Sequence, residues 1–368
     1  MKLRFNREEL VETLSAICSV ASSRSPKEIL KCARLEAQSD VLLVTATDLE
    51  IGLRSAVIQV EVEEPGEVLV VADTLAKIVR ECSDEVMTLE TEGSTLHVRG
   101  EGSHFKIVTQ AAEDFPAVAV FDGDADFTIA HTTLQRLVEW TLFASAREST
   151  RYAINGVLWE IEDDRLALAA TDGRRLSVAR AKLEDASGAG ASSAIVPSKA
   201  LSLLAKLSAE ADARIAVKLT ANQMFLKVGR AMLSTSLIEG HFPKYRDVIP
   251  KDCDRVVMLN TSEFHSALKR AALLTNDESK GVRLAFGDGT LTLSSRAPEQ
   301  GEATISLPVK YDGEPTEMGF NPTFLMDVLR VSHVEEIRFA FKEANRPGVL
   351  QIGDDFVHVV MPVNLSSA

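Results

Sequence analysis

The sequence has few cysteines, no long apolar run and an N-terminus that is not apolar. Each of these features argues against a class of protein. The 368 residues include four cysteines, at positions 18, 32, 82 and 253, with no CxxC pair, so neither a disulfide framework nor a cysteine zinc site is expected. No apolar run of about 18 residues occurs, so we expect no membrane-spanning helix. The N-terminus, MKLRFNREEL, is charged where a signal peptide is apolar, so we expect a cytoplasmic protein without a membrane partner.

Motifs of catalysis and cofactor binding are missing as well. The seven histidines form no HExxH or other close pair with metal-ligand spacing, and no P-loop or GxSxG elbow appears. The most conspicuous polar segment is TDGRR at 171–175, and a similar TDL stands at 47–49. Asp and Gly are turn formers, and a motif that recurs in a repeated unit is more easily structural than catalytic. We therefore expect no enzymatic activity, no cofactor and no metal. A hydrolase or transferase built on residues 171–175 is the alternative.

A unit of about 120 residues is present three times, which is the size of a domain rather than of a solenoid repeat. Each copy opens with an amphipathic helix, whose apolar rows are Leu10, Leu14 and Ile17, then Leu134, Val138 and Leu142, then Phe264, Leu268 and Ala271. A second short helix is expected after Asp73, Ser198 and Asn321. A chain of three like domains is more often a symmetric scaffold than an enzyme with a single pocket.

Between the helices, apolar and polar residues alternate with a period of two, at 41–63, 156–184 and 282–295. Alternation interrupted by Asp-Asp and Gly-Asp-Gly turns predicts half-buried antiparallel hairpins. Each copy is therefore predicted to be an α+β domain, with two helices packed on antiparallel sheets. Asn6 and Asn260, each followed three residues later by Glu, predict capping boxes. Polar, turn-rich stretches between the copies place the domains at 1–124, 125–252 and 253–368.

Five motifs, in order along the chain, resemble one family. They are RYAINGVLWE (151–160), AATDGRRLSVAR (169–180), EGHFPKYRDVIP (239–250), PEQGEA (298–303) and HVVMPVN (358–364). Together, they are similar to the bacterial DNA polymerase III beta subunit, the sliding clamp family, over essentially the whole chain. The resemblance implies three DNA-clamp domains and a head-to-tail homodimer that closes into a ring around duplex DNA. It implies no catalysis: a clamp loader opens the ring, and the loader, the polymerase III alpha subunit, other DNA polymerases and repair proteins bind the clamp through short linear motifs.

A net charge of −14 and a pI of about 5.1, taken alone, disfavour nucleic acid, because affinity there comes mostly from neutralised phosphates. The resemblance resolves this conflict, since a ring stays on DNA by topology and tight contacts would hinder sliding. An acidic exterior keeps the ring soluble, and modest positive charge on inner helices suffices. We expect DNA-facing side chains at Lys77, Arg80, Arg136, Lys199, Lys206, Lys269, Arg270 and Arg330. The resemblance also places at DNA the residues Arg24, Tyr152 and Lys199.

The resemblance further implies a pocket for partner peptides between the second and third domains, which takes motifs with a Gln and two hydrophobic anchors. The matching positions are Ile154, Thr171, Gly173, Arg174, Arg175, Leu176, Pro243, Val248, Asn321, Phe324, Val359, Val360, Met361, Pro362 and Val363. Apolar walls suit Leu or Phe anchors, and a few polar groups orient the peptide. For Val359 and Val360 an ordinary terminal strand is the alternative. The residues that depart from those common in the family, which bears on peptide preference, are Arg174, Asp247, Ser279 and Asn364.

The dimer contact should join the first domain of one chain to the third domain of the next. Phe105, Ile107, Leu273 and Leu274 match the family's apolar contacts, with domain core as the alternative. The runner-up function is a non-ring scaffold that recruits partners through the same pocket. We also expect that deletion from Val359 to the end weakens peptide binding and leaves the fold intact.

Overall fold

The computed structural model describes residues 1–147, 153–184, 191–207, 210, 212–275 and 281–364. The chain folds into two compact units that do not coincide with the three copies. The first unit comprises Met1–Gln135, Leu183–Gly190 and Lys199–Ile238, and the second comprises Arg136–Lys182, Ala191–Ser198 and Glu239–Ala368. The middle copy is therefore divided between the two units.

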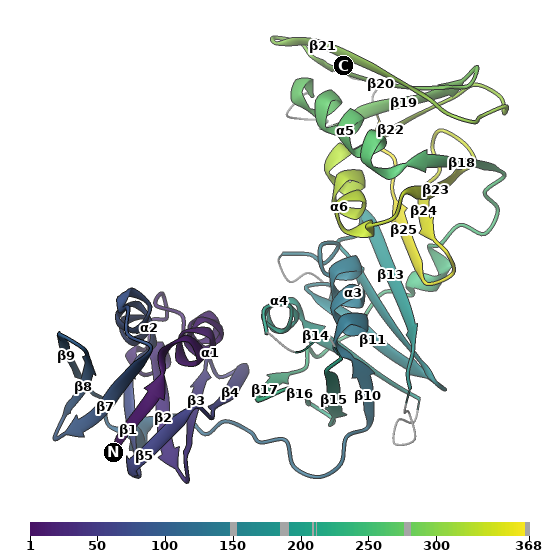
Figure 1. Cartoon of the computed structure of the whole chain (residues 1–368). Coiled ribbons are helices and arrows are strands. Elements are labelled where there is room, and N and C mark those ends of the chain that lie inside the picture. Colours follow the sequence, from purple (N-terminus) through teal and green to yellow (C-terminus); the bar gives the residue numbers. More distant parts are fainter. Residues whose placement is uncertain (148–152, 185–190, 208–209, 211, 276–280, 365–368) are drawn as a thin grey trace. The chain divides into compact units, whose positions relative to one another are not determined.

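The described residues contain two α-helices in each copy, as the repeat predicts (Figure 1). Leu10 and Leu14 of the first helix are fully buried, and so are Phe264 and Leu268 of the fifth, so the predicted apolar rows face the core. No helix among the described residues has both the length and the hydropathy that a bilayer span needs. The helices are α1 (Arg7–Val20), α2 (Ala72–Glu81), α3 (His131–Leu142), α4 (Ser198–Leu204), α5 (Thr261–Ala271) and α6 (Pro322–Ser332).

The first unit contains two antiparallel sheets, with strand orders β5-β1-β7-β8-β9 and β10-β15-β16-β17-β4-β3-β2-β6. Helices α1 and α2 pack on each other, with α1 over β3 and β4 and α2 over β6. The strands are β1 (Lys2–Asn6), β2 (Cys32–Gln38), β3 (Val41–Thr47), β4 (Ile51–Val57), β5 (Val60–Glu64), β6 (Gly66–Val71), β7 (Val86–Glu92), β8 (Thr95–Gly100), β9 (Ser103–Val108), β10 (Phe127–Ala130), β15 (Arg214–Leu219), β16 (Gln223–Val228) and β17 (Ala231–Ser236).

The second unit contains the sheets β14-β11-β12-β13-β25-β24-β23-β18 and β21-β20-β19-β22, again antiparallel. Helices α5 and α6 pack on each other, with α5 over β20 and β21 and α6 beside β25. The hairpins expected from the alternating patterns are therefore present. The strands are β11 (Gly156–Glu162), β12 (Arg165–Thr171), β13 (Arg175–Lys182), β14 (Ser192–Pro197), β18 (Arg255–Asn260), β19 (Val282–Gly287), β20 (Thr290–Ala297), β21 (Gly301–Pro308), β22 (Thr316–Phe320), β23 (Glu336–Phe341), β24 (Gly348–Ile352) and β25 (Phe356–Val360).

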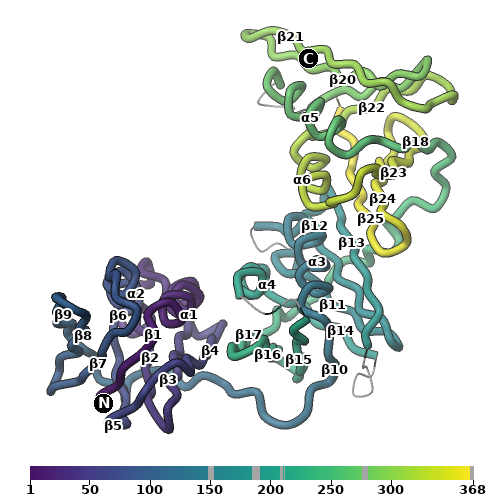
Figure 2. The backbone as a smooth tube through the Cα atoms, in the orientation of Figure 1, coloured from purple at the N-terminus to yellow at the C-terminus, as the bar shows by residue number. Residues whose placement is uncertain are grey.

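Neighbouring copies share the two large sheets. In the first unit, β17 of the middle copy pairs with β4 of the first copy, with Leu233 opposite Leu53. In the second unit, β13 of the middle copy pairs with β25 of the third copy, with Val178 opposite Val357. Figure 2 shows these strands side by side although they are far apart in the sequence. The middle copy thus contributes strands to both large sheets.

The predicted capping boxes are half formed. The side chains of Asn6 and Asn260 accept hydrogen bonds from the N–H groups of Glu9 (3.2 Å) and Glu263 (3.0 Å), as expected for N-caps. A capping box also predicts that the Glu9 carboxylate accepts from the Asn6 N–H. That prediction is wrong, because the carboxylate accepts from the N–H groups of Ile58 and Gln59 instead. Glu9 therefore orients the segment before β5 rather than closing its own helix.

Candidate functional site

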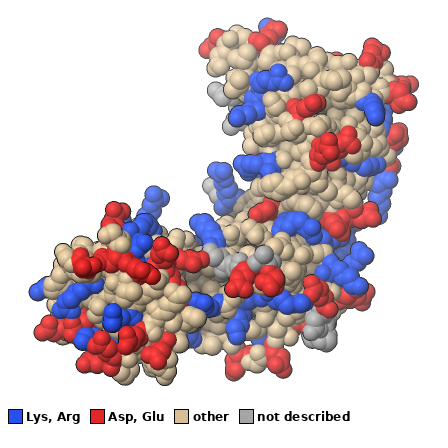
Figure 3. Space-filling model, in the orientation of Figure 1, with Lys and Arg blue, Asp and Glu red and all other residues tan. Residues whose placement is uncertain are grey.

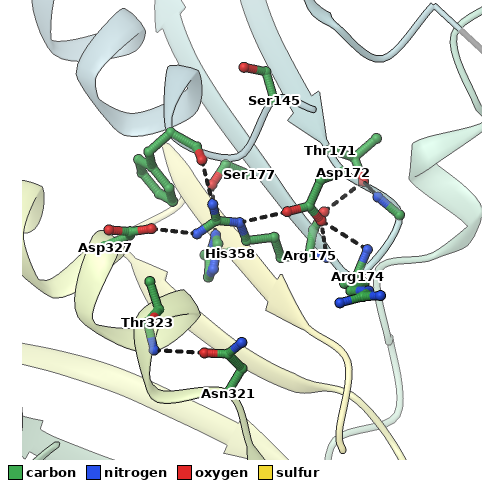
Figure 4. Close-up of polar contacts among 12 residues, drawn as sticks. Ser145, Thr171, Asp172, Arg174, Arg175, Ser177, Asn321, Thr323, Asp327 and His358 are labelled. Atoms are coloured by element: carbon green, nitrogen blue, oxygen red, sulfur yellow. Dashed lines mark hydrogen bonds and ion pairs between the residues drawn. The ribbon is translucent and has the colours of Figure 1, made fainter. Parts of the chain in front are cut away.

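Residues 171–175 form the turn between β12 and β13. The Thr171 hydroxyl donates to the Arg175 carbonyl at 2.6 Å and accepts from the Gly173 N–H at 3.1 Å. Asp172 Oδ1 accepts from the N–H groups of Arg174 at 2.9 Å and Arg175 at 3.1 Å. Gly173 has φ of 85°, a region that favours glycine. The Thr and Asp side chains are therefore used by the turn itself (Figure 4).

The first copy builds the same turn between β3 and β4. The Thr47 hydroxyl donates to the Ile51 carbonyl at 2.9 Å and accepts from the Leu49 N–H at 3.0 Å. Asp48 Oδ1 accepts from the N–H groups of Glu50 at 3.0 Å and Ile51 at 2.7 Å. Leu49 has φ of 82°, close to the value of the matching glycine. The Thr-Asp pair is thus a structural feature shared by the first and middle copies, and this role accounts for the polar residues offered as a catalytic alternative.

Arg175 ties its turn to two other elements. The Nε atom donates to Asp172 at 3.1 Å and Nη1 to Asp327 of α6 at 2.7 Å. Nη2 donates to the Phe143 carbonyl, just after α3, at 2.6 Å (Figure 4). The guanidinium also lies 4.5 Å from the ring centroid of Phe324, a cation–π contact. Because its side chain is 10% exposed and every nitrogen is engaged, Arg175 holds the turn against α6.

A buried polar pair lies next to this arginine. The hydroxyl of Ser177 in β13 and Nδ1 of His358 in β25 are 2.6 Å apart, and both residues are fully buried. Burial, and then the nearby charge of Arg175, lower the pKa of His358 to about 3, because both disfavour the imidazolium form. The two copies are therefore joined here by a neutral hydrogen bond.

The last strand of the chain belongs to the core. Val359 and Val360 are 1% and 0% exposed in β25, which pairs with β13 on one side and β24 on the other. The expectation that deletion from Val359 leaves the fold intact is therefore wrong, because that cut would shorten a strand with neighbours on both sides. Val359 and Val360 are therefore residues of an ordinary terminal strand, which was the alternative to their assignment to the pocket.

Beyond β25 the chain comes to the surface. The Met361 N–H donates to the Arg174 carbonyl at 2.9 Å, and the Val363 N–H donates to the Gly319 carbonyl at 2.8 Å. The segment is therefore held between the β12–β13 turn and β22. Met361 is 40% exposed, and Pro362 and Val363 line a hollow of about 530 Å³. Apolar side chains at the edge of a hollow suit the anchors of a peptide.

The short 3₁₀-helix η3 (Tyr245–Asp247) positions two further predicted pocket residues. The Tyr245 hydroxyl bonds to Glu160 of β11 at 2.5 Å, and Arg246 pairs with the same carboxylate at 3.1 Å, so η3 is fixed to the sheet. On either side of η3, Pro243 is half-buried and Val248 is 47% exposed.

Three other predicted pocket residues have structural roles in this chain. Ile154 and Leu176 are 7% and 3% exposed. Asn321 caps α6, since its side-chain oxygen accepts from the Thr323 N–H at 3.0 Å, and Pro322 is the first helical residue. The accessible part of the predicted pocket is therefore made by the turn, η3 and the segment after β25.

Comparison with known proteins matches this arrangement copy by copy. Family models for the N-terminal, central and C-terminal domains of the DNA polymerase III beta subunit match residues 1–119, 128–244 and 246–364. The beta sliding clamp of Pseudomonas aeruginosa is 33% identical over 368 residues, which covers 99% of this chain and 100% of the relative. The chain belongs to the beta sliding clamp family. The clamp of Escherichia coli K12 is 32% identical over 370 residues, with the same coverage.

Solved structures of sliding clamps have the same fold. A sliding clamp of Pseudomonas aeruginosa bound to griselimycin has a TM-score of 0.93 at 32% identity and covers 99% of this chain and 100% of its own. The clamp of Bacillus subtilis has a TM-score of 0.93 at 25% identity and covers 99% of each chain. The α+β fold of three clamp domains, expected from the sequence, is thereby confirmed.

All described residues that were predicted to face DNA in this clamp are exposed. Tyr152 lies outside the described residues. On the visible face, acidic and basic side chains are mixed (Figure 3). Three of the predicted cations are already matched by a carboxylate among the described residues; two of these pairs have the i,i+3 or i,i+4 spacing of helix neighbours, and the third joins residues 151 positions apart. These ion pairs are Lys77–Asp73 at 2.6 Å, Arg330–Asp327 at 3.2 Å, and Lys199–Asp48.

The residues expected at the clamp's dimer contact differ in exposure. Phe105 is 37% exposed and Leu273 is 74% exposed, whereas Ile107 is 7% exposed and Leu274 is half-buried. Phe105 lies on β9, the edge strand of its sheet, where Val108 is 77% exposed. The accessible apolar surface at this edge therefore comes from Phe105 and Val108, and Ile107 contributes to the core. A contact between chains stays a prediction.

Sequence reasoning missed the groups that hold this part of the clamp together. Asp327 lies 152 residues from Arg175, and the helical pattern assigns an acid beside Arg330 to a solvated face. Ser177 and His358 left a better signal, because each is a polar residue at a core position of an apolar strand.

Proposed function

We propose that this family member acts in the cytoplasm as a DNA sliding clamp. Two copies close head to tail into a ring around duplex DNA, each contributing domains 1–124, 125–252 and 253–368. The likeness to sliding clamps along 99% of the chain, with the three family domains in order, carries the proposal. The net charge of −14 fits this role, because a closed ring needs no strong phosphate binding to stay on DNA.

The contact that closes the proposed ring joins the β9 edge of one chain to the third domain of the next. Phe105 and Leu273 support this placement, since both are exposed apolar residues that a partner chain would cover. Such a contact is heterologous, so it gives a ring only when the rotation between copies closes.

The DNA-facing side chains in this proposal are Arg24, Tyr152 and the cations of the helices. The ion pairs of Lys77, Lys199 and Arg330 reduce their attraction for phosphate. Weak attraction suits a ring that slides, because each phosphate contact would have to break at every step.

Partner proteins dock, in this proposal, through short linear motifs on the surface formed by the β12–β13 turn, η3 and Met361–Val363. The partners are the polymerase III alpha subunit, the clamp loader, other DNA polymerases and repair proteins. The exposed side chains of Met361 and Val248 support this placement, because methionine adapts to varied apolar ligands.

Solution mass by light scattering tests the ring. We expect a dimer of roughly twice the 40.0 kDa chain mass. Leu273→Asp combined with Leu274→Asp should give monomers, because a partner chain would bury unpaired carboxylates. Val120→Asp is the matched control, since Val120 is also an exposed apolar residue, at 53%, outside the proposed contact. A doubly substituted protein that stays dimeric would place the contact elsewhere.

Retention on DNA tests the topology. With the clamp loader of the same organism, the protein should stay on nicked circular DNA in high salt and leave once the circle is cut, since salt weakens phosphate contacts but does not open a ring.

A monomer at every concentration that still binds partner peptides would favour the non-ring scaffold.

A further inference from the structure

Strand β18, the first strand of the third copy, has one free edge. It is the last strand of its sheet, beside β23 (Figure 1). The N–H of Thr261, the next residue, donates to the Glu335 carbonyl of the neighbouring chain segment at 2.9 Å. Because an antiparallel ladder alternates, the N–H groups of Val256, Met258 and Asn260 point away from β23. No backbone group in the described part of the chain pairs with them there, so β18 presents a row of unpaired donors and acceptors.

The first copy shows what covers the same edge. Strand β1 is the counterpart of β18, because each ends in the Asn that caps the following helix. Strand β5 pairs with β1 on the edge away from β7, where the Asn6 N–H donates to the Gln59 carbonyl at 2.9 Å. Among the described residues of the third copy no strand takes the place of β5, since β21 pairs with β20 and β22 with β19. The edge that the first copy covers with its own strand is therefore open in the third.

A carboxylate beside the open edge is also without a partner. In the first copy, Glu9 accepts from two successive N–H groups, at 3.1 and 2.8 Å, where the chain enters β5. Its counterpart Glu263 is exposed, and no donor in the described ranges bonds to its carboxylate. Glu263, Asn260 and Met258 line one hollow of about 280 Å³. The acceptor that orders an added strand in the first copy is thus present and free in the third.

The outward side chains of the two strands differ in kind. In β1 they are Lys2 and Arg4, each of which pairs with a glutamate of β5. In β18 the corresponding positions hold Val256 and Met258, which are 41% and 46% exposed. Neighbouring side chains on paired strands stabilise a sheet when their chemistry matches. A strand that covers β18 should therefore carry apolar residues where β5 carries glutamates.

We propose that the open edge of β18 is a further docking site, which binds an extended segment of a partner protein by strand addition. The segment runs antiparallel to β18, as β5 runs to β1. Its first N–H groups bond to Glu263, and its apolar side chains lie against Met258 and Val256. The site lies in the third copy and shares no residue with the surface formed by the β12–β13 turn, η3 and Met361–Val363. It therefore goes beyond the proposed function and does not depend on that surface.

Two peptides test the ligand class. One is QVEVEE, the sequence of residues 59–64, and the other is QVLVLE, in which Leu replaces both central glutamates; both carry the same polar tail. Each is titrated into the full chain and followed by amide NMR. QVLVLE should shift the amide signals of Val256, Met258 and Asn260 and bind about two- to tenfold more tightly than QVEVEE. Equal affinities, or shifts confined to other residues, would overturn the proposal.

N-methylated peptides distinguish strand addition from apolar contact alone. In the β1–β5 register, the N–H at the place of Glu61 faces β1, whereas the N–H at the place of Val60 faces away. Methylation of QVLVLE at the former place should weaken binding at least about tenfold, because a backbone hydrogen bond is lost and the methyl group meets β18. Methylation at the latter place is the matched control and should leave the affinity unchanged. Equal losses from both methyl groups would rule out strand addition.

Glu263→Ala tests the carboxylate. It should weaken binding of QVLVLE by about three- to tenfold, because two N–H groups of the ligand lose a charged acceptor. Glu299→Ala is the control, at an exposed glutamate of the same copy that has no ion-pair partner in the described structure. Equal affinities of the two variants would contradict the proposed placement. Protection of the Met258 amide by raised protein concentration alone, without peptide, would assign the edge to a second copy of this chain and overturn the proposal as well.

Discussion

Nη1 of Arg175 lies 2.7 Å from Oδ2 of Asp327, which binds the β12–β13 turn of the middle copy to helix α6 of the third copy. The two side chains are 10% and 18% exposed, so the pair is largely shielded from water. The arginine also keeps Asp172 and the Phe143 carbonyl as partners. Asp327 is therefore one of three anchors of the same guanidinium.

Asp327→Asn should lower the free energy of unfolding by about 1–3 kcal/mol, because it leaves a largely buried cation with one charge partner fewer. Urea unfolding monitored by near-UV circular dichroism measures the change. Asp247→Asn is the control: Asp247 is exposed and has no ion-pair partner in the part of the chain that the structure describes, so its loss should change stability by less than about 0.5 kcal/mol. Identical unfolding curves for Asp327→Asn and the native protein would show that the pair adds nothing.

His358 should make stability depend on pH. Its pKa is lowered to about 3 in the fold by burial and by Arg175, whereas an unfolded histidine titrates near 6.5. The unfolded chain therefore binds the extra proton first, and stability is lost as pH falls from about 6.5 toward 3, by up to about 1.4 kcal/mol per unit.

His358→Gln should flatten this part of the stability profile. The neutral side chain has no proton to gain, so unfolding midpoints measured between pH 7 and pH 4 should fall less steeply than in the native protein. His241→Gln, at an exposed histidine, should leave the native slope. Parallel profiles for His358→Gln and the native protein would mean that His358 is not what titrates.

The two ends of the last strand should respond differently to truncation. A chain that stops after Val360 keeps β25 whole, so its thermal midpoint should stay close to native while peptide affinity falls by about tenfold, since Met361 and Pro362 are lost. A chain that stops after His358 loses two fully paired core residues and should unfold at a lower temperature. Calorimetry and peptide anisotropy on both truncations separate the effects. Native affinity in the longer truncation would remove the end of the chain from the docking surface.

Local patterns in the sequence predicted the elements of this fold well. The hairpins at 41–63 and 282–295 follow from strict alternation and turn chemistry, both of which act between near neighbours. Asn6 and Asn260 cap their helices as expected for the same reason. The repeat predicted a pair of helices in each copy, and the resemblance of the five motifs indicated the family.

Long-range partners could not be predicted in the same way. Nothing in the spacing of Asp327 indicates an arginine 152 residues away, because pairing between copies depends on how the strands of different copies line up. The burial of Val359 and Val360 could not be predicted from the sequence for a related reason. Alternation of apolar and polar residues identifies a strand, but whether both edges of that strand are paired depends on distant segments. The reciprocal bond of Glu9 failed because a tertiary contact with the segment before β5 competed with the local one.

The shared sheets bear on how such a chain can change by recombination. Strands β17 and β13 of the middle copy are each completed by a strand of another copy. A cut between two copies would separate these paired strands and expose rows of unpaired backbone N–H and C=O groups, which are templates for aggregation. The three copies of the sequence are therefore not three separable modules, because the boundaries between them run through continuous sheets.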